Sequence, residues 1–145
     1  MKSLFVRFLM VVAMLATSSF LRAAEADSTF NWNPVMDAIN QVESGGNPQA
    51  RNGQYVGVLQ IAPVLVRECN NILKSRGSAT RFTLNDRLNK EKSKEMFKVI
   101  MSRYNPECDV DKACRIWKAG IRYTIKGTQA FVNRVRSVMK KQAGK

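Results

Sequence analysis

The sequence has no histidine at all, and it contains only 11 acidic residues against 24 basic ones. The absence of histidine excludes Ser-His-Asp and Cys-His nucleophilic catalysis, and with them the common zinc hydrolases. The three cysteines form no Cys-x-x-Cys pair, which argues against a metal site. An enzyme made from this chain must therefore use carboxylates, hydroxyls, lysines or thiols, and we expect no cofactor.

Carboxylates are missing from one long interval. After Glu43, the next acidic residue is Glu68, and the residues between them begin as a polar run rich in glycine, asparagine and glutamine. A glutamate in this position either belongs to an ordinary helix ending or is an acid held over a cleft. If it is an acid, it has no partner carboxylate in the interval that follows.

The first 26 residues have the layout of a secretory signal peptide. Positive charge precedes an apolar run from Phe8 to Ala16, and small residues follow, with cleavage expected between residues 23 and 26. A transmembrane anchor is the weaker interpretation, because Arg7 interrupts an already short apolar run. We therefore expect an exported protein, periplasmic or extracellular, whose mature chain is not stably inserted in a membrane.

The mature chain is strongly basic. Removal of residues 1–26 takes away three basic residues and one acidic residue, which changes the net charge from +13 to +11. Such a charge favours an acidic polymer or surface as partner: nucleic acid, anionic lipid or a carboxylate-rich cell wall. An exported protein rarely meets nucleic acid, so we expect none as partner. An oxidising compartment also permits one disulfide among Cys69, Cys108 and Cys114, and the spacing leaves its pairing open.

Helical periodicity predicts a mainly α, small single domain over residues 27–145, with a minor hairpin-like stretch. Asn33-Pro34 is typical of an N-cap followed by the first helical residue, and Gly45-Gly46 is typical of a helix end. Glu43 then falls on the last turn, at the negative end of the helix dipole, where a charged carboxylate is not stabilised.

The rest of the mature chain is predicted as helices joined by turns. We expect extended structure over residues 55–61, and a second helix from Pro63 to about Leu73. A capping box at residues 83–86 is expected before a third helix, whose apolar face contains Met96, Phe97, Ile100, Met101 and Tyr104. A short helix should run from Asp111 to Gly120, and a last helix should begin at Thr128 as N-cap.

Three blocks, in order, resemble the signature of soluble lytic transglycosylases. They are Glu-Ser-Gly-Gly-Asn-Pro at residues 43–48, Gly-Val-Leu-Gln-Ile-Ala-Pro at residues 57–63, and Arg-Ile-Trp-Lys-Ala-Gly at residues 115–120. The resemblance implies a lysozyme-like domain that cleaves peptidoglycan between N-acetylmuramic acid and N-acetylglucosamine. It also implies that Glu43 first protonates the glycosidic oxygen and then takes the proton of the muramoyl C6 hydroxyl, which closes a 1,6-anhydro ring without water.

The same resemblance suggests substrate-binding roles for Ser44, Gln60, Trp117 and Lys118, each with a plainer alternative. Ser44 is equally explained as local capping, Gln60 as a side chain facing water, and Trp117 as part of the core. Trp117-Lys118 stands where the family usually has Tyr-Asn. A lysine directed at Glu43 would weaken the acid, whereas one directed at solvent or at a peptide-stem carboxylate would not.

Other functions remain open from the sequence. A hydrolytic lysozyme would use Glu68 or Asp86 as a second carboxylate to activate water. A peptidoglycan-binding module would keep the fold without catalysis. A basic nucleic-acid or membrane binder is supported only by net charge, since no binding motif is present.

Overall fold

The structure is a computed structural model that describes residues 30–144, and the chain from Trp32 onward forms one compact unit. As predicted, this unit is mainly helical with one small antiparallel hairpin. The expected signal peptide, residues 1–26, lies outside the described residues. The elements are α2 (Asn33–Ser44), β1 (Arg51–Asn52), β2 (Tyr55–Val56), α3 (Pro63–Ser75), a 3-10 helix (Leu84–Leu88), α4 (Lys90–Tyr104), α5 (Val110–Ala119) and α6 (Ile125–Ala143).

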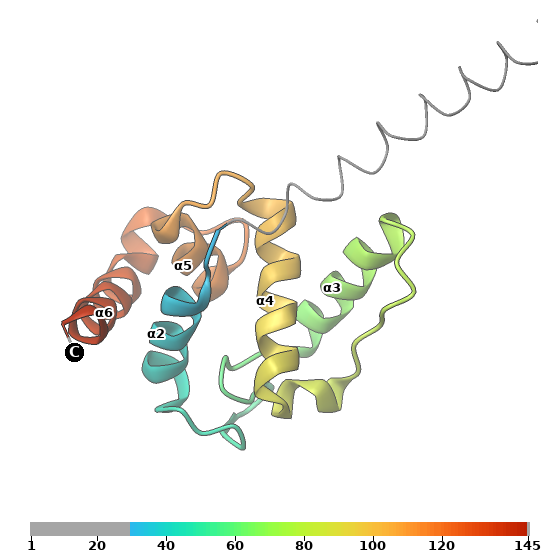
Figure 1. Cartoon of the computed structure of the whole chain (residues 1–145), viewed down its shortest axis with the longest axis horizontal. Coiled ribbons are helices and arrows are strands. Elements are labelled where there is room, and N and C mark those ends of the chain that lie inside the picture. Colours follow the sequence, from blue (N-terminus) through green and yellow to red (C-terminus); the bar gives the residue numbers. More distant parts are fainter. Residues whose placement is uncertain (1–29, 145) are drawn as a thin grey trace, which may run out of the picture. The chain divides into compact units, whose positions relative to one another are not determined.

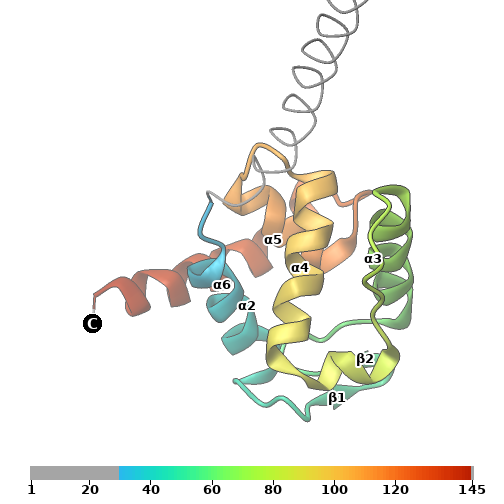
Figure 2. The ribbon, with the colours of Figure 1, turned by 45° about the vertical axis from the view of Figure 1, so that its right-hand side comes forward.

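Helix α4 stands between α2 and α3 in both ribbon views (Figures 1 and 2). Helix α3 packs against α4, and α6 packs against both α2 and α5. The hairpin follows the carboxyl end of α2, so the first two of the three sequence blocks are adjacent along the chain. Within residues 30–144, no helix has the length and apolar character needed to cross a membrane.

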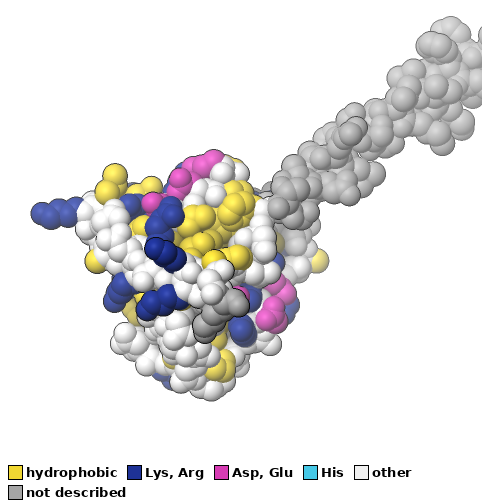
Figure 3. Space-filling model, turned by 60° about the vertical axis from the view of Figure 1, so that its left-hand side comes forward, with side chains coloured by type: hydrophobic (Ala, Val, Ile, Leu, Met, Phe, Trp, Pro, Cys, Tyr) yellow, Lys and Arg dark blue, Asp and Glu magenta, His cyan; other side chains and the backbone are white. Residues whose placement is uncertain are grey.

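Basic side chains are prominent on the surface. On the face drawn in Figure 3, Lys and Arg side chains lie beside an area of hydrophobic side chains. Two of the large exposed hydrophobic residues, Ile121 and Ile125, are each followed directly by a basic residue, Arg122 and Lys126. The excess of positive charge is therefore carried by the folded unit as well as by the amino-terminal segment.

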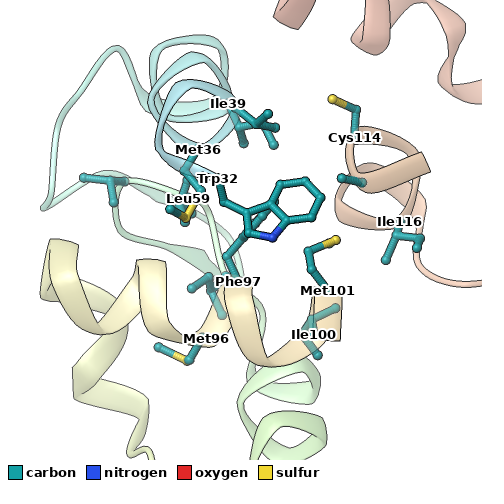
Figure 4. Packing of buried hydrophobic residues seen from close by; sticks show 14 of the residues in the cluster. Trp32, Met36, Ile39, Leu59, Met96, Phe97, Ile100, Met101, Cys114 and Ile116 are labelled. Carbon is teal, nitrogen blue, oxygen red and sulfur yellow. The ribbon is translucent and has the colours of Figure 1, made fainter. Parts of the chain in front are cut away.

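Phe97 of α4 lies at the centre of the core, between two tryptophans. Its ring centroid is 5.5 Å from that of Trp32 in an edge-on arrangement, and 4.9 Å from that of Trp117. These separations are in the favourable range for aromatic pairs. Figure 4 shows the side chains of α2, α4 and α5 that converge there. The stripe predicted on α4 is confirmed for Met96, Phe97, Ile100 and Met101, which are all buried, whereas Tyr104 is only partly buried.

Three predicted helix starts are wrong by one to four residues. Helix α2 begins at Asn33 itself, and Trp32 holds the cap position without a side-chain capping bond, because its ring packs in the core. Helix α5 begins at Val110, capped by Asp109. Helix α6 begins one turn before the predicted Thr128, because the Thr124 hydroxyl accepts the Gly127 N–H at 3.1 Å.

The capping box at Thr83 and Asp86 is confirmed, but it opens the 3-10 helix. Helix α4 has its own cap, since the Asn89 side chain accepts the Lys92 N–H at 3.0 Å. Only Tyr55–Val56 of the predicted extended stretch is a strand. The chain then turns at residues 57–60 and pairs again through the Val56–Ile61 bridge.

The turn at residues 57–60 is held against the 3-10 helix by a buried arginine. Arg87 donates from Nη1 to the carbonyl oxygens of Gln54 and Ile61, both at 3.1 Å, and from Nε to that of Leu84 at 2.8 Å. Its side chain is largely removed from solvent, so backbone carbonyls rather than water stabilise its charge. Arg87 therefore ties the hairpin to the segment that precedes α4.

We expect Arg87→Met to lower the free energy of unfolding by about 3 kcal/mol, because the change keeps an apolar stem but removes the donors of three hydrogen bonds, one buried and two partly buried. Urea unfolding followed by circular dichroism measures the loss. The matched control is Arg81→Met. Arg81 is exposed, although its guanidinium also donates to two backbone carbonyls. Equal losses for the two variants would show that Arg87 does not hold the hairpin.

All three cysteines lie in the described part of the chain, and each has a free thiol, so the disulfide that export would permit is not formed. Cys69 and Cys114 are buried, and desolvation raises the pKa of each thiol to about 12. Cys108 is partly exposed. Burial and the raised pKa together make the two core thiols inert.

One thiol of three is therefore expected to react with dithiobis(nitrobenzoate) at pH 8 in the native protein, and all three in denaturant. Cys108→Ser should abolish the native reaction, which absorbance and mass spectrometry both measure. Rapid labelling of two or three thiols in the native protein would contradict the packing of Cys69 and Cys114.

Candidate active site

Glu43 lies on the last turn of α2, as the sequence predicts. The helix ends at Ser44, and its C-cap Gly45 adopts the left-handed conformation with φ 62° and donates its N–H to the Gln41 carbonyl. Gly46 also has a positive φ, 88°. Two residues that lack side chains therefore come directly after Glu43 and Ser44. The Glu43 side chain is 18% exposed, which makes it mostly sheltered and still accessible.

Ser44 joins the end of α2 to the turn that follows the hairpin. Its hydroxyl lies 2.9 Å from the Val58 carbonyl oxygen, and 3.0 and 3.1 Å from the side-chain and backbone oxygens of Asn40. These acceptors share one hydroxyl proton. In this structure Ser44 therefore holds the first sequence block against the second.

Gln60 folds back onto its own turn instead of facing water. Its side-chain N–H groups donate to the carbonyl oxygens of Gly57 at 2.9 Å and Ala50 at 3.3 Å. The residue has φ 51°, a left-handed backbone that costs a non-glycine residue energy. The amide donors are thus engaged in shaping the turn, and the side-chain oxygen is the group that stays available for a ligand.

Trp117 combines features of the two alternatives considered from the sequence, a core residue and a residue open to a ligand. Its indole N–H donates to the Leu59 carbonyl oxygen at 3.0 Å, and its ring packs on Phe97. The side chain is only partly buried. It therefore joins the third sequence block to the second, and part of its surface remains open to solvent.

Lys118 points at Glu43, the first of the two orientations considered from the sequence. Its Nζ lies 3.6 Å from Glu43 Oε1 and 5.2 Å from the centroid of the Phe131 ring. The lysine side chain is 43% exposed, so the ion pair is screened by water and contributes little stability. A cation at the glutamate is nevertheless the main difference between this site and the signature that the three blocks resemble.

The three sequence blocks, of which the third is far from the other two in the chain, are thus joined pairwise. Ser44 connects the first block to the second, Trp117 connects the third to the second, and Lys118 connects the third to the first. Two of these contacts end on backbone carbonyls of Val58 and Leu59. The turn at residues 57–60 is therefore the platform on which the carboxylate and the tryptophan are positioned.

The two carboxylates considered as partners of Glu43 have other contacts. Glu68 accepts a hydrogen bond from the Tyr104 hydroxyl at 2.6 Å, and this bond raises the pKa of Tyr104. Asp86 accepts the N–H of Thr83 at 2.6 Å and its hydroxyl at 3.1 Å, as the acid of the capping box. Both side chains thus link or cap secondary structure.

Sequence reasoning missed Arg115, which positions the third block. Its guanidinium donates to the Ile125 carbonyl at 3.0 Å, to the Thr128 hydroxyl at 2.8 Å and to the Gln129 side-chain oxygen at 2.7 Å. These bonds fix the end of α5 on the first turns of α6. The available signal was an arginine between the apolar residues Cys114 and Ile116 of an amphipathic helix.

Within residues 30–144, no three His, Cys, Asp or Glu side chains are grouped to hold a metal ion. No protein-family model, no curated protein and no solved structure matches the chain. What the site does must therefore be argued from its own residues.

Proposed function

We propose that this protein is an exported lytic transglycosylase that cleaves peptidoglycan strands between N-acetylmuramic acid and N-acetylglucosamine. One observation supports this most: the three blocks that resemble the family signature contact one another around Glu43, through Ser44, Trp117 and Lys118. The lysozyme-like architecture is part of the same proposal. Export rests on the layout of residues 1–26.

In the proposed reaction, the protonated Glu43 donates its proton to the glycosidic oxygen, and the bond from that oxygen to C1 of the muramoyl residue breaks. The N-acetyl group of the substrate stabilises the cationic centre. The C6 hydroxyl of the same residue then attacks C1, and its proton passes to the Glu43 carboxylate. The products are a free N-acetylglucosamine end and a 1,6-anhydromuramoyl end, and no water is consumed.

A single carboxylate fits this reaction better than it fits hydrolysis. Ordinary glycosidases use a second acid to activate water or to attack the sugar. Here Glu68 and Asp86 are engaged with Tyr104 and Thr83. In the proposal, the exposed part of Trp117 stacks on a sugar ring and the Gln60 side-chain oxygen accepts from an N-acetyl or hydroxyl group, while Ser44 shapes the site.

Mass analysis of digested peptidoglycan tests the proposal. Purified sacculi incubated with the protein should release muropeptides that end in 1,6-anhydromuramic acid, each lighter by one water than the corresponding hydrolysis product. Release of reducing ends alone would contradict the transglycosylase reaction and favour a hydrolytic lysozyme. Sacculi left intact would contradict both enzymatic functions.

A second function, peptidoglycan binding without cleavage, is favoured by the Lys118–Glu43 ion pair. The Lys118 ammonium lies 3.6 Å from Glu43 Oε1, so the proposed acid already has a partner in the free protein. This function predicts that the protein sediments with sacculi and never clears them. Lys118→Asn, which restores the residue usual in the family, should then produce clearing.

A further inference from the structure

The Lys118 side chain is held at the site by two weak contacts. Its Nζ–Oε1 distance of 3.6 Å to Glu43 exceeds the roughly 2.7–2.9 Å of a charge-assisted hydrogen bond. Its second contact is the face of the Phe131 ring, 5.2 Å away. A cation–π contact at an exposed site contributes about 0.5–1 kcal/mol. Together they keep the ammonium near the carboxylate without fixing it there.

The exposure of the pair shows which partner a ligand reaches more easily. The lysine side chain is 43% exposed and the glutamate 18%, so the ammonium is the outer member. Lys118 also stands in the last turn of α5, and the next two residues, Ala119 and Gly120, are exposed. An incoming anion can therefore meet Lys118 without first displacing other side chains of this turn.

We infer that Lys118 is a specificity-determining residue that recognises a carboxylate on the muramoyl part of the substrate. This inference rests on the proposed function. In the free protein Lys118 pairs with Glu43, and in the complex it pairs with the substrate carboxylate. The exchange moves the ammonium from Glu43 to the substrate, which leaves the Glu43 side chain free to meet the glycosidic oxygen. Strands with a carboxylate near the cleaved bond are therefore better substrates than neutral strands.

Carboxylates with this chemistry have two sources in peptidoglycan. One is the lactyl group of a muramoyl residue that has lost its stem peptide, and the other is the stem peptide itself. Within residues 30–144, Lys118 is the one lysine that pairs with Glu43, so one carboxylate suffices in either case. The two sources differ in how far the charge lies from the sugar ring, and experiment separates them.

Four substrates test the inference: stem-free strands and stem-bearing strands, each with carboxylates free or converted to neutral amides by carbodiimide and ammonia. We expect the protein to cleave free-carboxylate strands of at least one kind about tenfold faster than their amidated counterparts, the effect of one charged hydrogen bond. The kind of strand, stem-free or stem-bearing, whose cleavage slows on amidation identifies the source of the carboxylate that Lys118 recognises. Lys118→Asn should bring the ratio close to one, and Lys118→Arg should retain it.

A structural role for Lys118 would change all four rates together and leave their ratios unaltered. Equal cleavage of free and amidated strands of both kinds by the unaltered protein would overturn the inference and leave the transglycosylase proposal standing. Absence of anhydro products from every substrate would refute that proposal instead. In that case a co-sedimentation assay tests the inference without any cleavage. If the unaltered protein and Lys118→Asn bound free-carboxylate strands equally well, the inference would be overturned.

Discussion

Replacing Glu43 with glutamine should reduce the release of 1,6-anhydromuropeptides by at least about a hundredfold. The amide has nearly the shape of the carboxyl group, but it neither donates the proton to the glycosidic oxygen nor takes one from the C6 hydroxyl. The change also removes the ion pair with Lys118, and because that pair is screened by water, the fold should be unaffected. Mass analysis of soluble products measures the rate, and thermal unfolding verifies the fold.

Glu68→Gln is the matched control for this experiment. Its amide oxygen still accepts the hydrogen bond from Tyr104, so the packing of α3 on α4 is retained. We expect Glu68→Gln to keep nearly full activity. If it lost activity and Glu43→Gln did not, the acid would be Glu68, and the proposed site would be wrong.

Gly57→Ala should lower the free energy of unfolding by about 4 kcal/mol, among the largest effects of a single substitution. Gly57 has φ 83°, and an added Cβ would overlap the carbonyl oxygen of Arg87 and lie 2.8 Å from its carbonyl carbon. Both obstacles are backbone atoms, and Arg87 itself is held by three hydrogen bonds, so the neighbour has little freedom to yield. Urea or thermal unfolding measures the loss.

Gly46→Ala separates this overlap from backbone strain. Gly46 has nearly the same φ, 88°, but no atom lies within 4 Å of the position of its Cβ. It should therefore lose only the roughly 1–2 kcal/mol of a left-handed alanine. If the two variants were equally stable, the close approach of Gly57 to Arg87 would be refuted.

The sequence was sufficient for the parts of the fold that depend on local pattern. The end of α2 follows from Gly45-Gly46, and the position of Glu43 on the last turn follows from that end. The apolar stripe of α4 and the capping box at Thr83 are likewise local signals. Helix starts were less accurate. Thr124 and Thr128 both suit an N-cap. In the structure Thr124 caps α6, and the Thr128 hydroxyl instead accepts a hydrogen bond from Arg115, a tertiary contact that the sequence does not show.

The contacts that build the candidate site depend on tertiary structure, which spacing does not contain. Ser44 and Trp117 bond to backbone carbonyls. Every residue has such a carbonyl, so the sequence does not indicate which one is the partner. The hydrogen bonds by which Arg87 holds the hairpin also end on backbone carbonyls, so they could not be predicted from the sequence either. Lys118 was recognised as a departure from the pattern that the blocks resemble, but two orientations were consistent with the sequence. Only the packing of α2 and α5 on α6, which places Lys118 near Glu43 and Phe131, decides between them.

The arrangement of Phe97 between Trp32 and Trp117 gives the protein two optical probes with different surroundings. They are its only tryptophans. Trp32 is buried in the core, so its emission follows global unfolding. Trp117 is partly exposed and bonded to the Leu59 carbonyl, so a ligand that stacks on it, as proposed, should change its emission. Intrinsic fluorescence thus reports ligand occupancy and loss of the core as separate spectral events, without an attached dye.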